Sequence, residues 1–159
     1  MTAAGIEQGT GPKTEDPSTF DALLLLIGRL NYTWTNTESL LIHLIAGLSG
    51  TDKETAVVIF LTLNTTRARL DLVERLAKME RVSAEEREPV LAATARMQGL
   101  AALRNRYNHC IYSFDEESGG ISTILMRIAD RKDHIKIGKT TRIDEAAIRE
   151  IEDTIAEMT

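Results

Sequence analysis

Residues 104–110, with the sequence RNRYNHC, carry the side chains in this chain that are best suited to chemistry. Two of them are cationic, two are amides, and the others are a phenol, an imidazole and a thiol. On a helix, residues four apart share a face, which aligns Asn105 with His109 and Arg104 with Asn108. Arg104 and His109 lie about 140° apart around an ideal helix. Their side chains still converge on one ligand if the helix end lies beside a cavity or a partner.

Arginine and histidine together suit the cleavage of a phosphodiester bond without a metal ion. The guanidinium matches phosphate oxygens, and the imidazole exchanges protons near neutral pH. In RNA, a base removes the proton of the 2′-hydroxyl, the oxygen attacks the adjacent phosphorus, and an acid protonates the leaving oxygen. One histidine does not easily fill both roles, whereas two copies related by a two-fold axis divide them. The alternative is a solvated helix end, whose cations interact favourably with the helix dipole.

The segment Leu103–His109 resembles the Arg-x4-His motif of HEPN domains, including the polar residue that commonly follows the arginine. Trp34 and Glu38 are similar to the tryptophan and the acidic residue often found on the first long helix of that family. The resemblance implies a small helical bundle that dimerises. It also implies a metal-independent ribonuclease of a toxin–antitoxin, phage-defence or RNA-processing system, or a relative that has lost activity and acts as a binding module.

This resemblance assigns roles to individual residues. Arg104 and His109 become the catalytic pair, and Asn105 orients the histidine or a phosphate. One familiar toxin pattern has a tyrosine two residues after the histidine, but here Ile111 takes that place and Tyr112 follows it. Glu38 is expected to form a hydrogen bond into the site from the facing helix. The residues expected to bind substrate are Arg106, Asn108, Glu38, Lys132 and Lys136.

The charge of the chain is unevenly distributed. The formal net charge is −5 over 159 residues, which argues against a protein that coats nucleic acid along its whole surface. Residues 127–142, however, contain six basic and two acidic side chains. This stretch either extends a phosphate-binding track from the motif towards single-stranded RNA or forms an ordinary charged surface.

The sequence predicts neither a metal nor a cofactor. Cys110 is the single cysteine, so an intrachain disulfide is excluded, and His43, His109 and His134 show no metal-binding spacing. Cys110 and His109 are adjacent, and adjacent helical residues point about 100° apart. A small buried residue at a helix end therefore explains Cys110 better than a Cys/His nucleophile. The spacing of Trp34 favours a core position over a pocket.

The helical pattern is interrupted in only a few places. Residues 1–17 are rich in Gly, Thr, Pro and charge and predict a flexible tail, with Ser18 as a helix cap. Apolar segments stay well below the roughly 18 residues that cross a bilayer, so the expected location is the cytoplasm, away from membranes. The predicted long helices run from Thr19 to about Leu48, from Asp52 to Glu80 with a possible break near Asn64, and from the capping box Ser83–Glu86 into the motif.

A β segment is predicted between the motif and a closing helix. Strands at 111–114 and 121–128 form a hairpin, a short strand at 134–137 adds to it, and Asp144 caps the last helix. The predicted fold is therefore mainly α, spanning residues 18–159 as one domain with a small antiparallel β insertion at about 111–137. The resemblance of the motif implies that this domain is an HEPN-like helical bundle.

The sequence supports three hypotheses about function. The first is a dimeric, metal-independent endoribonuclease with a composite Arg/His site. The second is a catalytically inactive, HEPN-like dimer that binds nucleic acid or a partner protein such as a cognate antitoxin. The third is a purely structural helical dimer. The residues that separate these hypotheses are Arg104 and His109.

Overall fold

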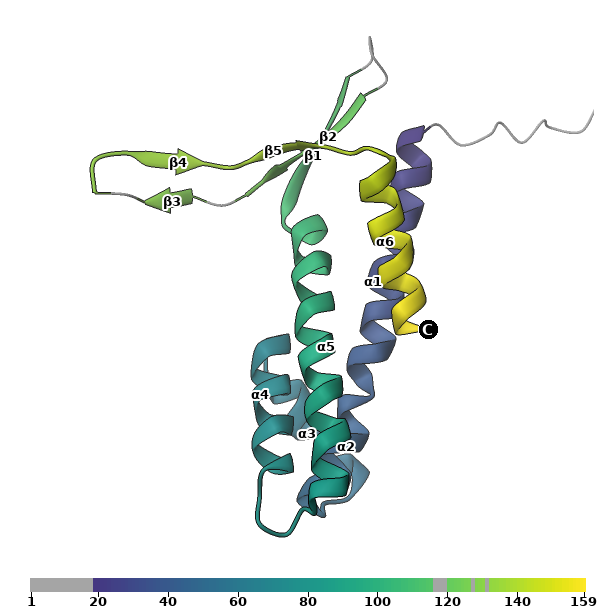
Figure 1. Ribbon diagram of the computed structural model, residues 1–159, viewed down its shortest axis with the longest axis vertical. Helices are drawn as coiled ribbons and strands as arrows, with labels where there is room; N and C mark the ends of the chain where they lie inside the picture. Colours follow the sequence, from purple (N-terminus) through teal and green to yellow (C-terminus); the bar gives the residue numbers. More distant parts are fainter. Residues whose placement is uncertain (1–18, 116–119, 127, 131) are drawn as a thin grey trace, which may run out of the picture.

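The computed structural model describes residues 19–115, 120–126, 128–130 and 132–159. These residues form a mainly helical structure with a small antiparallel sheet (Figure 1). No helix in these ranges is long and apolar enough to cross a membrane. The elements are α1 (Thr19–Ser39), α2 (Leu41–Ser49), α3 (Lys53–Thr62), α4 (Thr66–Ala77), α5 (Ala84–Asn108), β1 (Cys110–Asp115), β2 (Gly120–Leu125), β3 (Ile128–Asp130), β4 (Ile135–Ile137), β5 (Thr140–Arg142) and α6 (Glu145–Met158).

Three features predicted from the sequence fall outside the described residues. These are the tail at 1–17, the cap at Ser18 and most of the connection between the two predicted hairpin strands, at 116–119.

Capping side chains explain where the later helices begin. Asp52, Thr65 and Asp144 each accept a hydrogen bond from the backbone N–H three residues on, at the starts of α3, α4 and α6. Ser83 and Glu86 form the predicted capping box at the start of α5. The predicted break in the second helix is confirmed, because α3 and α4 are separate helices.

The prediction of one continuous helix from Thr19 to about Leu48 was wrong at Leu40, which separates α1 from α2. The side chains of Thr35, Thr37 and Ser39 donate hydrogen bonds to backbone carbonyls three or four residues earlier. Hydroxyls bonded in this way compete with the helical ladder and bend helices. Leu40 keeps right-handed helical dihedrals of φ −64° and ψ −22°, so α2 follows α1 without a loop.

The β segment contains a three-stranded sheet with the order β1-β2-β5. The predicted hairpin is confirmed, with β1 and β2 antiparallel and Cys110 opposite Leu125. The predicted second strand at 121–128 was too long, because β2 ends at Leu125 and Ile128 already belongs to β3. No Gly, Pro, Asn, Asp or Ser stands between Leu125 and Ile128, so the change of partner strand leaves no mark in the sequence. β5 completes the sheet and was not predicted.

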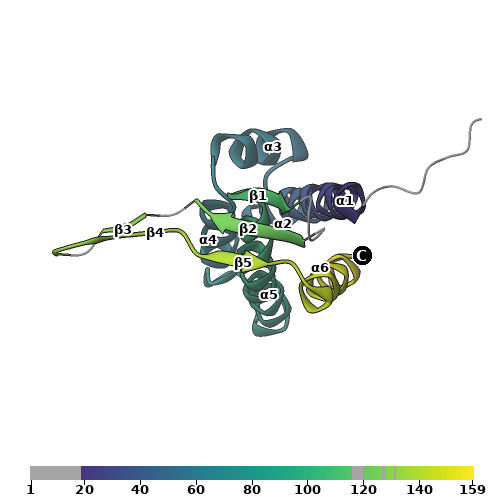
Figure 2. The same ribbon diagram turned by 90° about the horizontal axis from the view of Figure 1, so that it is seen from above.

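β3 and β4 form a separate two-stranded arm that extends away from the helices (Figures 1 and 2). The predicted strand at 134–137 is present as β4, but it pairs with β3 and not with the hairpin. Ile135 on this arm is 61% exposed. An isolated two-stranded ribbon is only marginally stable in water, so the arm adds little to the stability of the fold.

The apolar core consists of two clusters, which we name the upper and the lower cluster after their places in Figure 1. The upper cluster joins α1, α5, β2 and α6, and the lower cluster joins α2, α3 and α4. Trp34 is fully buried on α1, between Leu30 of the upper cluster and Leu41 of the lower one, which confirms its predicted core position. The upper cluster contains Leu23, Leu30, Leu103, Tyr107, Ile121, Ile151 and Ile155, and the lower cluster contains Leu41, Ile45, Ala56, Phe60, Leu70 and Val73.

Gly138 lies where the arm rejoins the sheet, and we expect Gly138→Ala to destabilise the protein. Its φ of +40° is a conformation that other residues rarely adopt. A Cβ there would lie 2.8 Å from the carbonyl oxygen of Leu125. The expected loss is about 1–3 kcal/mol of unfolding free energy, measured by urea denaturation.

Gly99 in α5 provides the matched control. A Cβ at Gly99 meets no atom within 4 Å. Gly99→Ala should therefore raise the unfolding free energy by about 0.5–1 kcal/mol, since alanine is the better helix former. Equal effects of the two substitutions would contradict the role given to Gly138.

Candidate catalytic site at the end of helix α5

The predicted motif forms the last turn of α5 and its cap. His109 is the C-cap residue, with φ −118° and ψ 40°, and its N–H donates to the carbonyl of Asn105. Its own carbonyl accepts a hydrogen bond of 3.1 Å from the N–H of Met126, which ties the helix end to the strand β2. The side chain of His109 is exposed. The imidazole is therefore open to solvent on a backbone that is fixed on both sides.

Arg104 lies one turn before the cap, against α1. Its guanidinium carbon is 5.8 Å from the centre of the Trp34 ring, within the range of a cation–π contact. Its Nη1 donates to Oδ1 of Asn105 at 2.9 Å. Its Nε is buried and finds no acceptor among the described residues. A buried donor without an acceptor costs about 1–3 kcal/mol, which makes this atom an exception that calls for an explanation.

The other polar side chains of the motif contact different helices. Asn108 faces α1 as Arg104 does and donates to Oδ1 of Asn31 at 2.7 Å. Arg106 faces α6 and forms an ion pair with Glu150 at 3.0 Å. Arg106 and Arg104 therefore face different helices. The two motif side chains predicted to bind substrate, Arg106 and Asn108, both make contacts inside the chain. Their role in substrate binding stays a prediction.

Glu38 is buried one turn after Trp34, where it joins the end of α1 to the start of α4. Its Oε1 accepts a hydrogen bond of 2.6 Å from Thr66 and lies 3.2 Å from Nη1 of Arg69. Arg69 in turn covers the ring of Phe60 at 4.0 Å and donates from Nε to the carbonyl of Phe60. The described contacts of Glu38 therefore lead to α4, and its predicted hydrogen bond into the site stays a prediction.

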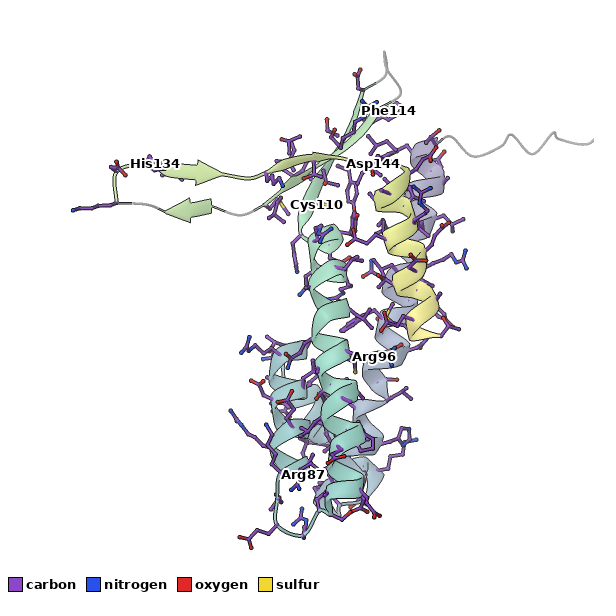
Figure 3. All side chains as sticks on the ribbon, viewed as in Figure 1. Arg87, Arg96, Cys110, Phe114, His134 and Asp144 are labelled. Atoms are coloured by element: carbon purple, nitrogen blue, oxygen red, sulfur yellow. The ribbon has the colours of Figure 1, made fainter. Side chains whose placement is uncertain are left out.

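The two predicted lysines belong to the arm. Lys132 lies in the segment between β3 and β4, and Lys136 lies on β4. Figure 3 shows His134 at the far end of the arm, whereas Cys110 directly follows α5. Within one copy, the structure does not bring these lysines to the motif, because the arm leads away from the helix end.

Residues after the motif turn inward to the last turn of α5. The hydroxyl of Tyr112 donates to the carbonyl of Tyr107 at 2.7 Å, and the thiol of Cys110 lies 3.3 Å from the same oxygen. Burial, followed by the hydrogen bond with Cys110, raises the pKa of Tyr112 well above its usual range. Burial also raises the pKa of Tyr107. Both phenols therefore stay neutral at physiological pH.

Sequence analysis missed the residues that hold the motif in place. Asn31 is the partner of Asn108, and Arg69 and Thr66 are the partners of Glu38. An amide among the apolar residues of α1 is the one signal that pointed to Asn31. In the parts of the chain that the structure describes, no group of three or more His, Cys, Asp or Glu residues is placed to hold a metal ion. Comparison with known proteins finds no significant match for the chain among protein-family models, curated proteins or solved structures.

Proposed function

We propose that the chain is a metal-independent endoribonuclease of the HEPN type that acts as a symmetric dimer. The observation that carries this proposal is that no carboxylate among the described residues is paired with Arg104. Arg96 and Arg106 on the same helix are paired with Glu157 and Glu150 of α6. Arg104 has only an amide and an indole as partners among the described residues. An unneutralised guanidinium one turn from an exposed imidazole is suited to binding a phosphodiester.

The proposed reaction divides the work between Arg104 and His109. One imidazole takes the proton of the 2′-hydroxyl as the bond from O2′ to phosphorus forms. The bond from phosphorus to O5′ breaks, and a second, protonated imidazole donates its proton to the leaving oxygen. The guanidinium stabilises the negative charge that builds on the phosphate oxygens. The products carry a 2′,3′-cyclic phosphate and a 5′-hydroxyl.

A second copy is needed because each chain supplies one histidine at this place. His109 is exposed, so its imidazole is accessible to another protomer. Tyr32, which follows the Asn31 that contacts the motif, is 73% exposed. Leu25, seven residues earlier on the same face of α1, is 66% exposed. An exposed apolar face of this kind suits contact with a second copy, and it supports a dimer.

The direct test is incubation of the purified chain with a mixed-sequence, single-stranded RNA in EDTA. We expect cleavage, with product ends that carry cyclic phosphate and 5′-hydroxyl groups. The same RNA with 2′-O-methyl groups should resist cleavage, because the nucleophile is blocked. Cleavage that requires an added divalent ion, or products with 3′-hydroxyl ends, would contradict the proposed chemistry.

A catalytically inactive dimer that binds nucleic acid or a partner protein, such as an antitoxin, is the second candidate. It is favoured by the intrachain contacts of Arg106 and Asn108 and by the acidic net charge of −5. Binding of the single-stranded RNA without any cleavage, by a protein that is folded and dimeric, would favour this candidate over the enzyme.

A further inference from the structure

Two buried hydrogen-bond donors without acceptors meet where Arg104 contacts Trp34. The Nε1 of Trp34 and the Nε of Arg104 are both buried and lack partners among the described residues. Both groups donate, so neither one satisfies the other. Buried donors of native proteins are usually paired, and exceptions call for an explanation. Here the two exceptions lie in one contact between α1 and the predicted motif.

The contact leaves the two ends of the guanidinium in different surroundings. The Nε side is buried, whereas the bond from Nη1 to Asn105 is exposed. Glu38, one turn after Trp34, is the nearest carboxylate along α1. Its described partners are Thr66 and Arg69, and not Arg104. Among the residues that the structure describes, Arg104 is therefore oriented by the aromatic ring and by the amide of Asn105 and not by an ion pair.

An aromatic ring positions a cation in a way that differs from a carboxylate. The ring attracts the cation through its quadrupole, but it neither cancels the charge nor occupies the outer N–H groups. A carboxylate in the same place would form a bidentate pair with the guanidinium and would compete with phosphate. The indole thus fixes the direction of Arg104 and leaves its charge and outer donors for a ligand.

We propose that Trp34 is a positioning residue, which holds the guanidinium of Arg104 at the end of α5. In this position, the outer N–H groups of the guanidinium donate to an oxygen of a phosphodiester. This inference rests on the proposed function and deepens it, because it explains how an arginine without an ion pair is kept in one orientation. It differs from a purely structural role, in which the ring only fills space in the core.

Trp34 is the single tryptophan of the chain, so its fluorescence reports directly on this contact. We would titrate the wild-type chain with a single-stranded 2′-O-methyl RNA that carries a dye outside the tryptophan range. The expected result is a saturable change in Trp34 emission that follows the anisotropy of the dye. Arg104→Ala should lose the emission change, and Arg67→Ala should keep it, because the Arg67 side chain is 89% exposed on α4.

The outcomes separate this inference from the proposed function. Binding seen by anisotropy with unchanged emission of Trp34 overturns the positioning role, while cleavage of ordinary RNA still supports the enzyme. Absence of binding together with absence of cleavage overturns both. An emission change that survives Arg104→Ala also contradicts the inference, because the contact between the ring and the guanidinium would not be its source.

Substitutions of Trp34 provide a second test, with cleavage as the measurement. Trp34→Phe keeps an aromatic face and should retain kcat/KM to within about threefold, whereas Trp34→Leu should lose about tenfold. Leu30→Ala is the matched control, since Leu30 is fully buried on the same helix. Equal losses for Trp34→Leu and Leu30→Ala, both folded, would show a role in packing alone. If Trp34→Leu does not fold, the fluorescence titration of the wild-type chain decides.

Discussion

His109→Ala is expected to lower kcat for RNA cleavage in EDTA by about 10²–10⁴-fold, the usual contribution of a general acid or base. Arg104→Ala is expected to lower it by about 10²–10³-fold, because the charge on the phosphate loses its stabilising donor. Both side chains sit at the end of a helix and outside the two clusters, so both variants should stay folded. Circular dichroism and thermal unfolding check this, and cleavage of a labelled RNA gives kcat.

His134→Ala is the matched control for His109→Ala, since His134 is exposed on the arm (Figure 3). It should cleave RNA at the wild-type rate. Equal cleavage rates for His109→Ala and His134→Ala would show that His109 takes no part in the reaction.

A mixing experiment tests whether the site is shared between copies. If both histidines are needed, a roughly tenfold excess of His109→Ala chains draws wild-type chains into inactive mixed dimers and suppresses their activity about tenfold. If each copy cleaves alone, the excess has no effect on activity per wild-type chain. Light scattering on the same samples shows whether dimers form.

Glu38→Ala is expected to have the largest effect on stability, with a loss of about 3–5 kcal/mol of unfolding free energy. The side chains of Glu38 and Arg69 are only 10% and 17% exposed, and removal of the carboxylate leaves the guanidinium buried and uncompensated. The hydroxyl of Thr66 also loses its acceptor. Since a domain is stable by only about 5–15 kcal/mol, urea denaturation should show this loss clearly.

Glu157→Ala is the matched control for the loss of an ion pair. The Glu157 side chain is 41% exposed and pairs with Arg96, which is 67% exposed, so its removal should cost about 0–1 kcal/mol. Similar losses of unfolding free energy in Glu38→Ala and Glu157→Ala would contradict the claim that burial strengthens the pair of Glu38 and Arg69. Cleavage by Glu38→Ala, compared at an equal folded fraction, also shows whether Glu38 acts on the site beyond its effect on stability.

The parts of the fold that were predicted correctly depend on signals that are local in sequence. The capping box at Ser83 and the cap at Asp144 involve residues three apart, and both are present. The strand β5 was missed because its pairing with β2 is set by residues far along the chain. Its residues, Thr140–Arg142, are all exposed, so they show no alternation of apolar and polar side chains.

In the candidate site too, local features could be predicted from the sequence and contacts between distant residues could not. The end of α5 could be predicted from the sequence, because the polar residues 104–110 interrupt an apolar pattern. The partner of Arg104 is Trp34, seventy positions earlier, and the partner of Asn108 is Asn31. These contacts depend on how α1 packs beside α5. Periodicity shows which face of a helix is buried, but not which residue of another helix it meets.

α5 couples the two apolar clusters, since Leu103 and Tyr107 belong to the upper one and Val90 and Met97 pack against the lower one. Apart from α5, the two clusters draw on different helices, so we expect the α2–α4 half to open locally while the upper half stays closed. Along the chain, Trp34 stands between Leu30 of the upper cluster and Leu41 of the lower one, so we expect such opening to change the surroundings of its contact with Arg104. A ligand that holds this contact closed stabilises both halves at once through mass action. The occupied protein should then unfold as a single cooperative unit.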